Sequence, residues 1–116
     1  MIRIFFRSFI YAFKGISISF AKERNLKVQL GVAILTVGAG FYCKITEAEW
    51  FAIVAMIGLV LSLEMINTAI ENLVNLVTLE QNPLAGKIKD VAAGAVLAAS
   101  IAAVVIGIII FRKYLI

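Results

Sequence analysis

Three long, mainly apolar stretches divide the chain, and each has a charged residue at both ends. They are Val28 to Cys43, Trp50 to Leu63 and Val91 to Phe111. A helix needs about 20 such residues to cross the hydrocarbon core, and only the last stretch is that long. Flanking lysines complete the first, and the second continues past Glu64 without proline or glycine until Pro83. We therefore expect membrane-spanning helices at about 26–43, 47–79 and 87–112.

Residues 1–22 follow an amphipathic pattern. At about 100° per residue, one helix face carries Arg3, Arg7 and Lys14, and the opposite face carries Ile2, Phe5, Phe9, Phe13, Ile16 and Phe20. This predicts a surface helix in the headgroup plane, acting as an anchor rather than contacting substrate. A signal peptide is the alternative, but the recurring charges leave it no uninterrupted apolar core.

Polar residues predict where the helices are joined. A short turn at 44–47 separates the first two spans, with Thr46 as the expected N-cap of the next helix. The second connection is expected at 80–86, where Pro83 and Gly86 should interrupt helical structure.

The amino-acid composition indicates that the protein lies in a lipid membrane rather than in water. Hydrophobic residues make up 63% of the 116 residues and charged residues 16%, whereas a soluble domain is about half apolar and a quarter charged. A soluble domain this small could not bury so much apolar surface. We expect one all-α integral-membrane domain over residues 1–116. Because the chain has no histidine and one cysteine, it has no internal disulfide, and a metal would bind carboxylate and amide oxygens, as Mg²⁺ or Ca²⁺ does.

The basic residues predict the orientation. With three spans, eight lysines and arginines lie on the side of the N-terminus and three, Lys44, Arg112 and Lys113, on the other. This asymmetry places the N-terminus and the second connection in the cytoplasm. The net charge of +4 is then explained by orientation and headgroup contact, not by nucleic-acid binding.

One helix face concentrates polar groups within the apolar sequence. Five residues lie within about 100° of one another on a helix: Glu64, Asn67, Thr68, Glu71 and Asn75. Hydrogen bonding between helices explains Thr68 and Asn75 as well as function does. The two acids are too costly next to lipid for packing alone and indicate a functional site.

Polar residues at two other helix ends should lie at the same depth. They are Glu23-Arg24-Asn25 before the first span and Lys89-Asp90 before the third. Asp90 is also explained as a favourable charge in the first turn of a helix. Together, acids that bind a divalent cation and a lysine for phosphate are the groups that phosphoryl transfer requires. No P-loop is present, because Gly86-Lys87-Ile88 lacks the hydroxyl residue after the lysine.

Two sequence strings carry a resemblance to a known family. They are Glu64-Met65-Ile66-Asn67-Thr68-Ala69-Ile70-Glu71 and Lys89-Asp90-Val91-Ala92-Ala93-Gly94-Ala95-Val96, supported by Glu23-Arg24-Asn25. With these strings the chain resembles the prokaryotic diacylglycerol kinases over nearly its whole length. The resemblance implies a surface helix and three spans, a homotrimer with active sites between subunits, and MgATP as phosphoryl donor.

The resemblance also implies a role for each matching residue. Glu64 is similar to the general base, and Asn67 to a polar partner that orients the site. Glu71 and Glu23 are similar to acids that bind the metal–ATP complex. Lys89 is similar to a lysine that contacts phosphate, and Asp90 to an acid on the nucleotide side.

Two positions depart from the family pattern. Many relatives have aspartate in place of Asn75 and histidine in place of Gln29. The first change removes a negative charge near the site, and we assign no function to Gln29 from sequence.

The family phosphorylates either diacylglycerol or undecaprenol. Glu23-Arg24-Asn25 and Asn82-Pro83-Leu84-Ala85 look more like the undecaprenol group, which we favour slightly. The alternative function is a small transporter or channel subunit that uses Glu71 as a cation or proton site. A transporter acid would lie near the membrane midplane, whereas Glu64 and Glu71 lie toward the cytoplasmic end.

Overall fold

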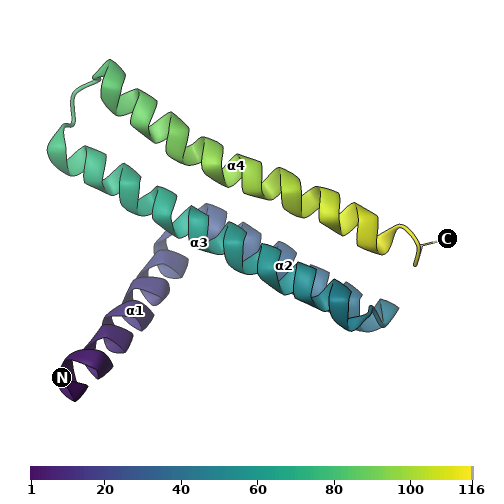
Figure 1. Cartoon of the computed structure of the whole chain (residues 1–116). Helices are drawn as coiled ribbons and strands as arrows, with labels where there is room; N and C mark the ends of the chain where they lie inside the picture. Colours follow the sequence, from purple (N-terminus) through teal and green to yellow (C-terminus); the bar gives the residue numbers. More distant parts are fainter. Residues whose placement is uncertain (116) are drawn as a thin grey trace.

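Four α-helices make up most of the residues that the structure describes (Figure 1). The computed structural model describes residues 1–115, and its helices are α1 (Ile2–Lys22), α2 (Arg24–Cys43), α3 (Glu47–Val77) and α4 (Pro83–Phe111). Within the described part of the chain there is no strand, and all four helices are long and apolar enough to span a membrane. The prediction of an all-α membrane protein is confirmed.

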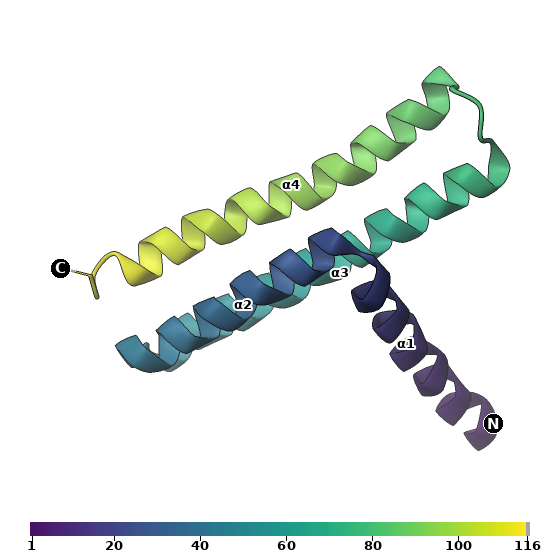
Figure 2. The ribbon, with the colours of Figure 1, turned by 180° about the vertical axis from the view of Figure 1, so that it is seen from behind.

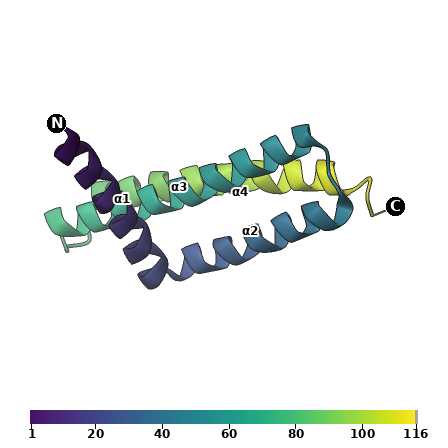
Figure 3. The same ribbon diagram turned by 90° about the horizontal axis from the view of Figure 1, so that it is seen from below.

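The helix α3 is the centre of the arrangement. It runs antiparallel to α4, with which it makes the most extensive contacts, and α2 packs less extensively on it (Figures 1 and 2). The helix α1 touches mainly α2 and leaves the other helices at a steep angle (Figure 3). We call the end with the α3–α4 connection the inner end and the end with the α2–α3 connection the outer end. A headgroup location for α1 remains a prediction.

Side-chain caps explain where α3 begins. The Thr46 hydroxyl accepts a hydrogen bond from the Glu49 backbone N–H at 3.2 Å, and the Glu49 carboxylate accepts one from the Thr46 N–H at 3.0 Å. This reciprocal capping box satisfies two amides that a helix start leaves without partners. The predicted N-cap is therefore confirmed.

The start of α4 corrects the expected second connection. We expected Pro83 and Gly86 to lie in a loop, but Pro83 is the first residue of α4 and Gly86 lies within the helix. Asn82 is the N-cap, and its side-chain oxygen accepts from the Leu84 N–H at 2.8 Å. Proline suits the first helical position because the N–H it lacks has no partner there in any helix. The helix thus begins about one turn earlier than the predicted residue 87.

Polar contacts fasten the outer end of α3 to the end of the chain. The Glu49 carboxylate pairs with the Lys113 ammonium at 2.6 Å and accepts a hydrogen bond from the Tyr114 hydroxyl at 2.6 Å. That hydrogen bond raises the pKa of the Tyr114 phenol, because the phenolate would face the carboxylate. Ile45, Ile53 and Ile110 form a small apolar cluster at the same end.

A single protomer buries little of its apolar surface. Among the residues described, only Leu26 has a large side chain that is fully buried, while leucines, isoleucines and phenylalanines on all four helices remain exposed. In water this surface would be unstable. Lipid or further copies of the chain must therefore cover it.

Close packing at the outer end predicts that two glycines of α2 differ in their tolerance of alanine. A Cβ on Gly40 would lie 2.8 Å from a ring carbon of Trp50, whereas one on Gly38 meets nothing within 4 Å. Gly40→Ala should lower the free energy of unfolding by about 1–3 kcal/mol through overpacking. Gly38→Ala, the matched control, should be neutral or slightly stabilising. Thermal unfolding in detergent, followed by circular dichroism, checks this, and equal midpoints for the two variants would contradict it.

Candidate active site

A buried carboxylate lies at the middle of α3. Glu64 is 4% exposed and follows directly after an apolar stretch that rises about 21 Å from Trp50. Its Oε2 atom lies 3.4 Å from the Gln29 side-chain nitrogen on α2, which donates a hydrogen bond to it. The helix pair α2 and α3 thus holds this acid away from lipid, as an intramembrane charge requires.

One turn further along α3, an amide meets a second carboxylate. The Asn67 side-chain nitrogen donates to the Glu71 carboxylate at 3.3 Å. Asn67 is 8% exposed, and its side-chain oxygen is buried without a hydrogen-bond donor, whereas Glu71 is exposed in the protomer. The pair therefore presents one carboxylate and one unsatisfied amide oxygen.

The inner end of the site joins α3 to α4. The Lys89 ammonium donates to the Asn75 side-chain oxygen at 2.7 Å. Both residues line a hollow of about 490 Å³ between the end of α3 and the start of α4. Because Asn75 is neutral, it orients the ammonium without cancelling its charge, and this charge is available to an anion that enters the hollow.

Two predicted site residues remain apart from these pairs. Glu23 is the half-buried N-cap of α2, in extended conformation between α1 and α2. Asp90 is exposed on α4. Within residues 1–115, neither side chain makes a hydrogen bond or ion pair with Lys89, and neither belongs to a group of three or more acids that could hold a metal ion.

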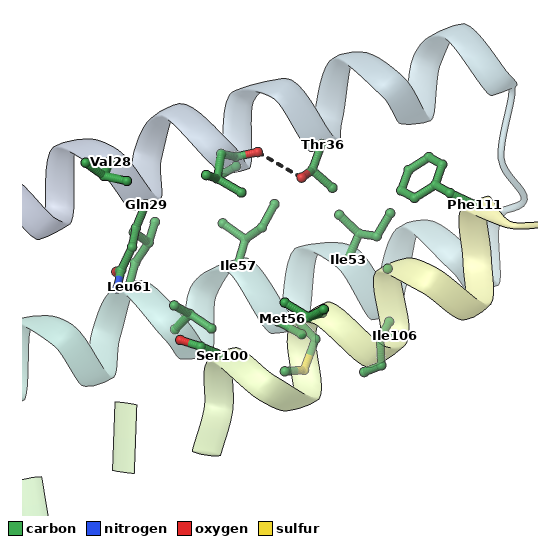
Figure 4. A pocket seen from close by; sticks show the side chains of 16 residues that line it. Val28, Gln29, Thr36, Ile53, Met56, Ile57, Leu61, Ser100, Ile106 and Phe111 are labelled. Atoms are coloured by element: carbon green, nitrogen blue, oxygen red, sulfur yellow. Dashed lines mark hydrogen bonds between the residues drawn. The ribbon is translucent and has the colours of Figure 1, made fainter. Parts of the chain in front are cut away.

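An apolar cavity of about 320 Å³ lies between α2, α3 and α4 (Figure 4). Its lining extends from Gln29 and Leu61 at one end to Ile53 and Phe111 toward the outer end. In Figure 4, Gln29 points from α2 toward Leu61 of α3. The same amide therefore borders the cavity and contacts Glu64.

The donor atoms are of the kind that a hard cation binds. The Glu71 carboxylate and the unsatisfied Asn67 oxygen are both oxygen ligands, which Mg²⁺ prefers to nitrogen or sulfur. Among the residues described, no group of three or more acidic, histidine or cysteine side chains surrounds a single point. A metal at Glu71 would therefore need further ligands from substrate, water or a second subunit.

Sequence reasoning missed the contribution of Gln29. The residue is polar near the start of the apolar stretch Val28 to Cys43, and a buried side-chain amide requires hydrogen-bond partners. That signal could have singled it out. Its partner could not be identified, because the pairing depends on how α2 packs on α3.

Fold and site together define a class of protein. This is a small, multi-pass helical membrane protein whose acids, amides and lysine follow one another along α3 and the start of α4. Such groups suit phosphoryl transfer at a membrane surface.

Comparison with known proteins identifies the family. The family model described as prokaryotic diacylglycerol kinase matches residues 10–111. Undecaprenol kinase of Bacillus subtilis (strain 168) is 40% identical over 107 residues, covering 92% of this chain and 87% of the relative. Diacylglycerol kinase of Synechocystis sp. is 43% identical over 104 residues, covering 86% and 58%. Diacylglycerol kinase of Haemophilus influenzae is 28% identical over 99 residues, covering 85% and 81%.

The chain belongs to the prokaryotic diacylglycerol kinase family. It is a phosphotransferase of the lipid-kinase class, and the predicted resemblance is confirmed. The alternative of a non-enzymatic transporter or channel subunit is not supported.

Proposed function

We propose that this enzyme transfers the γ-phosphoryl group of MgATP to the hydroxyl of a membrane lipid alcohol, with undecaprenol favoured over diacylglycerol. The buried Glu64 carboxylate carries this proposal. It stands where the apolar part of α3 meets the polar part, at the depth that a lipid hydroxyl near the inner headgroups reaches.

Glu64 acts as the general base in this proposal. Its carboxylate accepts the hydroxyl proton while the hydroxyl oxygen attacks the γ-phosphorus of ATP. The bond between that phosphorus and the β–γ bridging oxygen breaks, and ADP leaves with the electron pair. Asn67, one turn away, orients the neighbouring Glu71 carboxylate through its 3.3 Å contact.

The order of groups along α3 matches the order of groups in the reaction. Glu64, Glu71 and Asn75 follow one another over about 16 Å of helix. In this order Glu64 would accept the proton of the lipid hydroxyl, Glu71 would hold the metal ion, and Lys89, held by Asn75, would contact phosphates further from the acceptor. Asp90, next to Lys89, contributes on the nucleotide side.

Glu71 and Glu23 are the proposed metal ligands. The oxygen donors at Glu71 and Asn67 fit Mg²⁺. When bound, the ion neutralises charge on the phosphates. Because no group of three or more potential ligands is found among the described residues, we propose that a second copy of the chain contributes to the metal site, as the family resemblance implies.

A homotrimer is the proposed assembly, as the family resemblance implies. The exposed Glu71 and the extensive exposed apolar surface of one protomer support further burial between copies. The excess of basic residues on the side of the N-terminus supports a cytoplasmic N-terminus in the bacterial inner membrane. In this proposal α1 lies at the membrane surface. Residues 1–116 form one domain.

The favoured lipid rests on sequence likeness. Undecaprenol kinase of Bacillus subtilis matches at 40% identity and the Synechocystis diacylglycerol kinase at 43%, so identity does not separate the two lipids. The preference rests on Glu23-Arg24-Asn25 and Asn82-Pro83-Leu84-Ala85, which look more like the undecaprenol group.

Replacing the proposed base tests the mechanism. Glu64→Gln keeps the size of the side chain but cannot accept the hydroxyl proton, so kcat should fall by about 10²-fold or more. Steady-state assays in mixed micelles measure kcat, and circular dichroism checks folding. Near-normal turnover in a folded variant would remove Glu64 from this role.

Replacing the proposed metal ligands should change the magnesium requirement. Glu71→Gln or Glu23→Gln removes an anionic oxygen, so the Mg²⁺ or ATP concentration for half-maximal rate should rise by about ten-fold. Glu47→Gln, at an exposed acid in the first turn of α3 at the outer end, is the matched control. Titration curves like wild type for both Glu71 and Glu23 variants would overturn the metal assignment.

Parallel assays with the two lipids test the acceptor. With each lipid at equal mole fraction in mixed micelles, kcat/KM should be higher for undecaprenol than for diacylglycerol. A higher value for diacylglycerol would overturn the preference and leave the kinase intact. Transfer to neither lipid, with ATP and Mg²⁺ present, would overturn the proposed reaction.

A further inference from the structure

We propose that Gln29 is a positioning residue for the reaction, acting through Glu64. This inference rests on the proposed function, in which Glu64 is the base. It concerns how α2 contributes to a site whose acids lie mainly on α3.

The geometry selects Gln29 among the polar residues of α2. Its side-chain nitrogen lies 3.4 Å from Glu64 Oε2, and the two residues are 35 positions apart in sequence. Of the α2 residues, it is the one that donates a side-chain hydrogen bond to another helix within the described part of the chain. Rotation of the Glu64 side chain is therefore opposed by a group outside its own helix.

An amide suits the partner of a base. It donates a hydrogen bond that orients the carboxylate, but it carries no charge that would cancel the negative charge needed to accept a proton. Because the bond uses Oε2, Oε1 is left for the substrate hydroxyl. At 3.4 Å the contact is longer than the usual 2.7–3.2 Å, and catalytic hydrogen bonds often shorten when substrate binds.

Gln29 also connects the base to the apolar cavity. It lines that cavity together with Val32 on the next turn of α2. Its side-chain oxygen is buried without a donor, so the amide is held from one side, through its bond to Glu64. The bond therefore sets where the carboxylate stands relative to the inner end of the cavity.

A double-mutant cycle tests this coupling. Gln29→Met keeps the length of the side chain but removes the donor, so kcat should fall by on the order of ten-fold with KM for ATP unchanged. In the Glu64→Gln background the same substitution should have no further effect, because the residue through which it acts is already lost. Val32→Met, which alters the cavity wall without touching Glu64, is the matched control and should leave kcat near wild type.

The outcomes separate this inference from the proposed function. If Glu64→Gln is nearly inactive while Gln29→Met turns over normally, Gln29 has no positioning role and the base assignment stands. Equal losses from Gln29→Met and Val32→Met, or full additivity with Glu64→Gln, would also overturn the inference. If Glu64→Gln itself turns over normally, the proposed function fails.

A spectroscopic measurement is independent of activity. The infrared carboxylate band that disappears in Glu64→Gln belongs to Glu64, one of only 7 acidic residues in the chain. Loss of a hydrogen bond should shift that band in Gln29→Met and leave it unchanged in Val32→Met. An unshifted band in Gln29→Met would contradict the contact on which the inference depends.

Discussion

The burial of an ionisable side chain within an apolar helix constrains the rest of this structure. Glu64 is 4% exposed, and a carboxylate removed from water must be hydrogen-bonded or neutralised. The amide of Gln29 supplies a donor from α2, which requires α2 to pack on α3 at this level. The packing of α2 on α3 and the hydrogen bonding of the proposed base therefore depend on one another.

The two ends of the helix bundle differ in chemistry. At the outer end Glu49 is saturated by Lys113, Tyr114 and the Thr46 backbone, and an acid with all its partners inside the protein acts structurally. Toward the inner end the polar groups are only partly satisfied: Glu71 is exposed, and Asn67 keeps a buried oxygen without a donor. Unsatisfied groups in a membrane protein indicate where another molecule binds.

Local rules explain how far the fold could be predicted. Apolar stretches of helical length, the Thr46 cap and the long uninterrupted run through Glu64 are properties of neighbouring residues, and the structure has helices there. The prediction that Pro83 lies in a loop was wrong, and the reason also lies in neighbouring residues. Proline stops a helix in its interior but favours its first turn, and the deciding factor was the Asn82 cap.

By itself the sequence determined that the protein lies in a membrane, where its helices are, and which chemical groups the site contains. Hydrophobicity and helical periodicity depend only on composition and order. It also placed Glu64, Asn67 and Glu71 on one helix face, since that follows from 3.6 residues per turn. Only the tertiary structure decided that Glu64 meets Gln29 and that Lys89 meets Asn75. Those pairs join different helices, and their contact depends on how the helices pack, which no local pattern in the chain specifies.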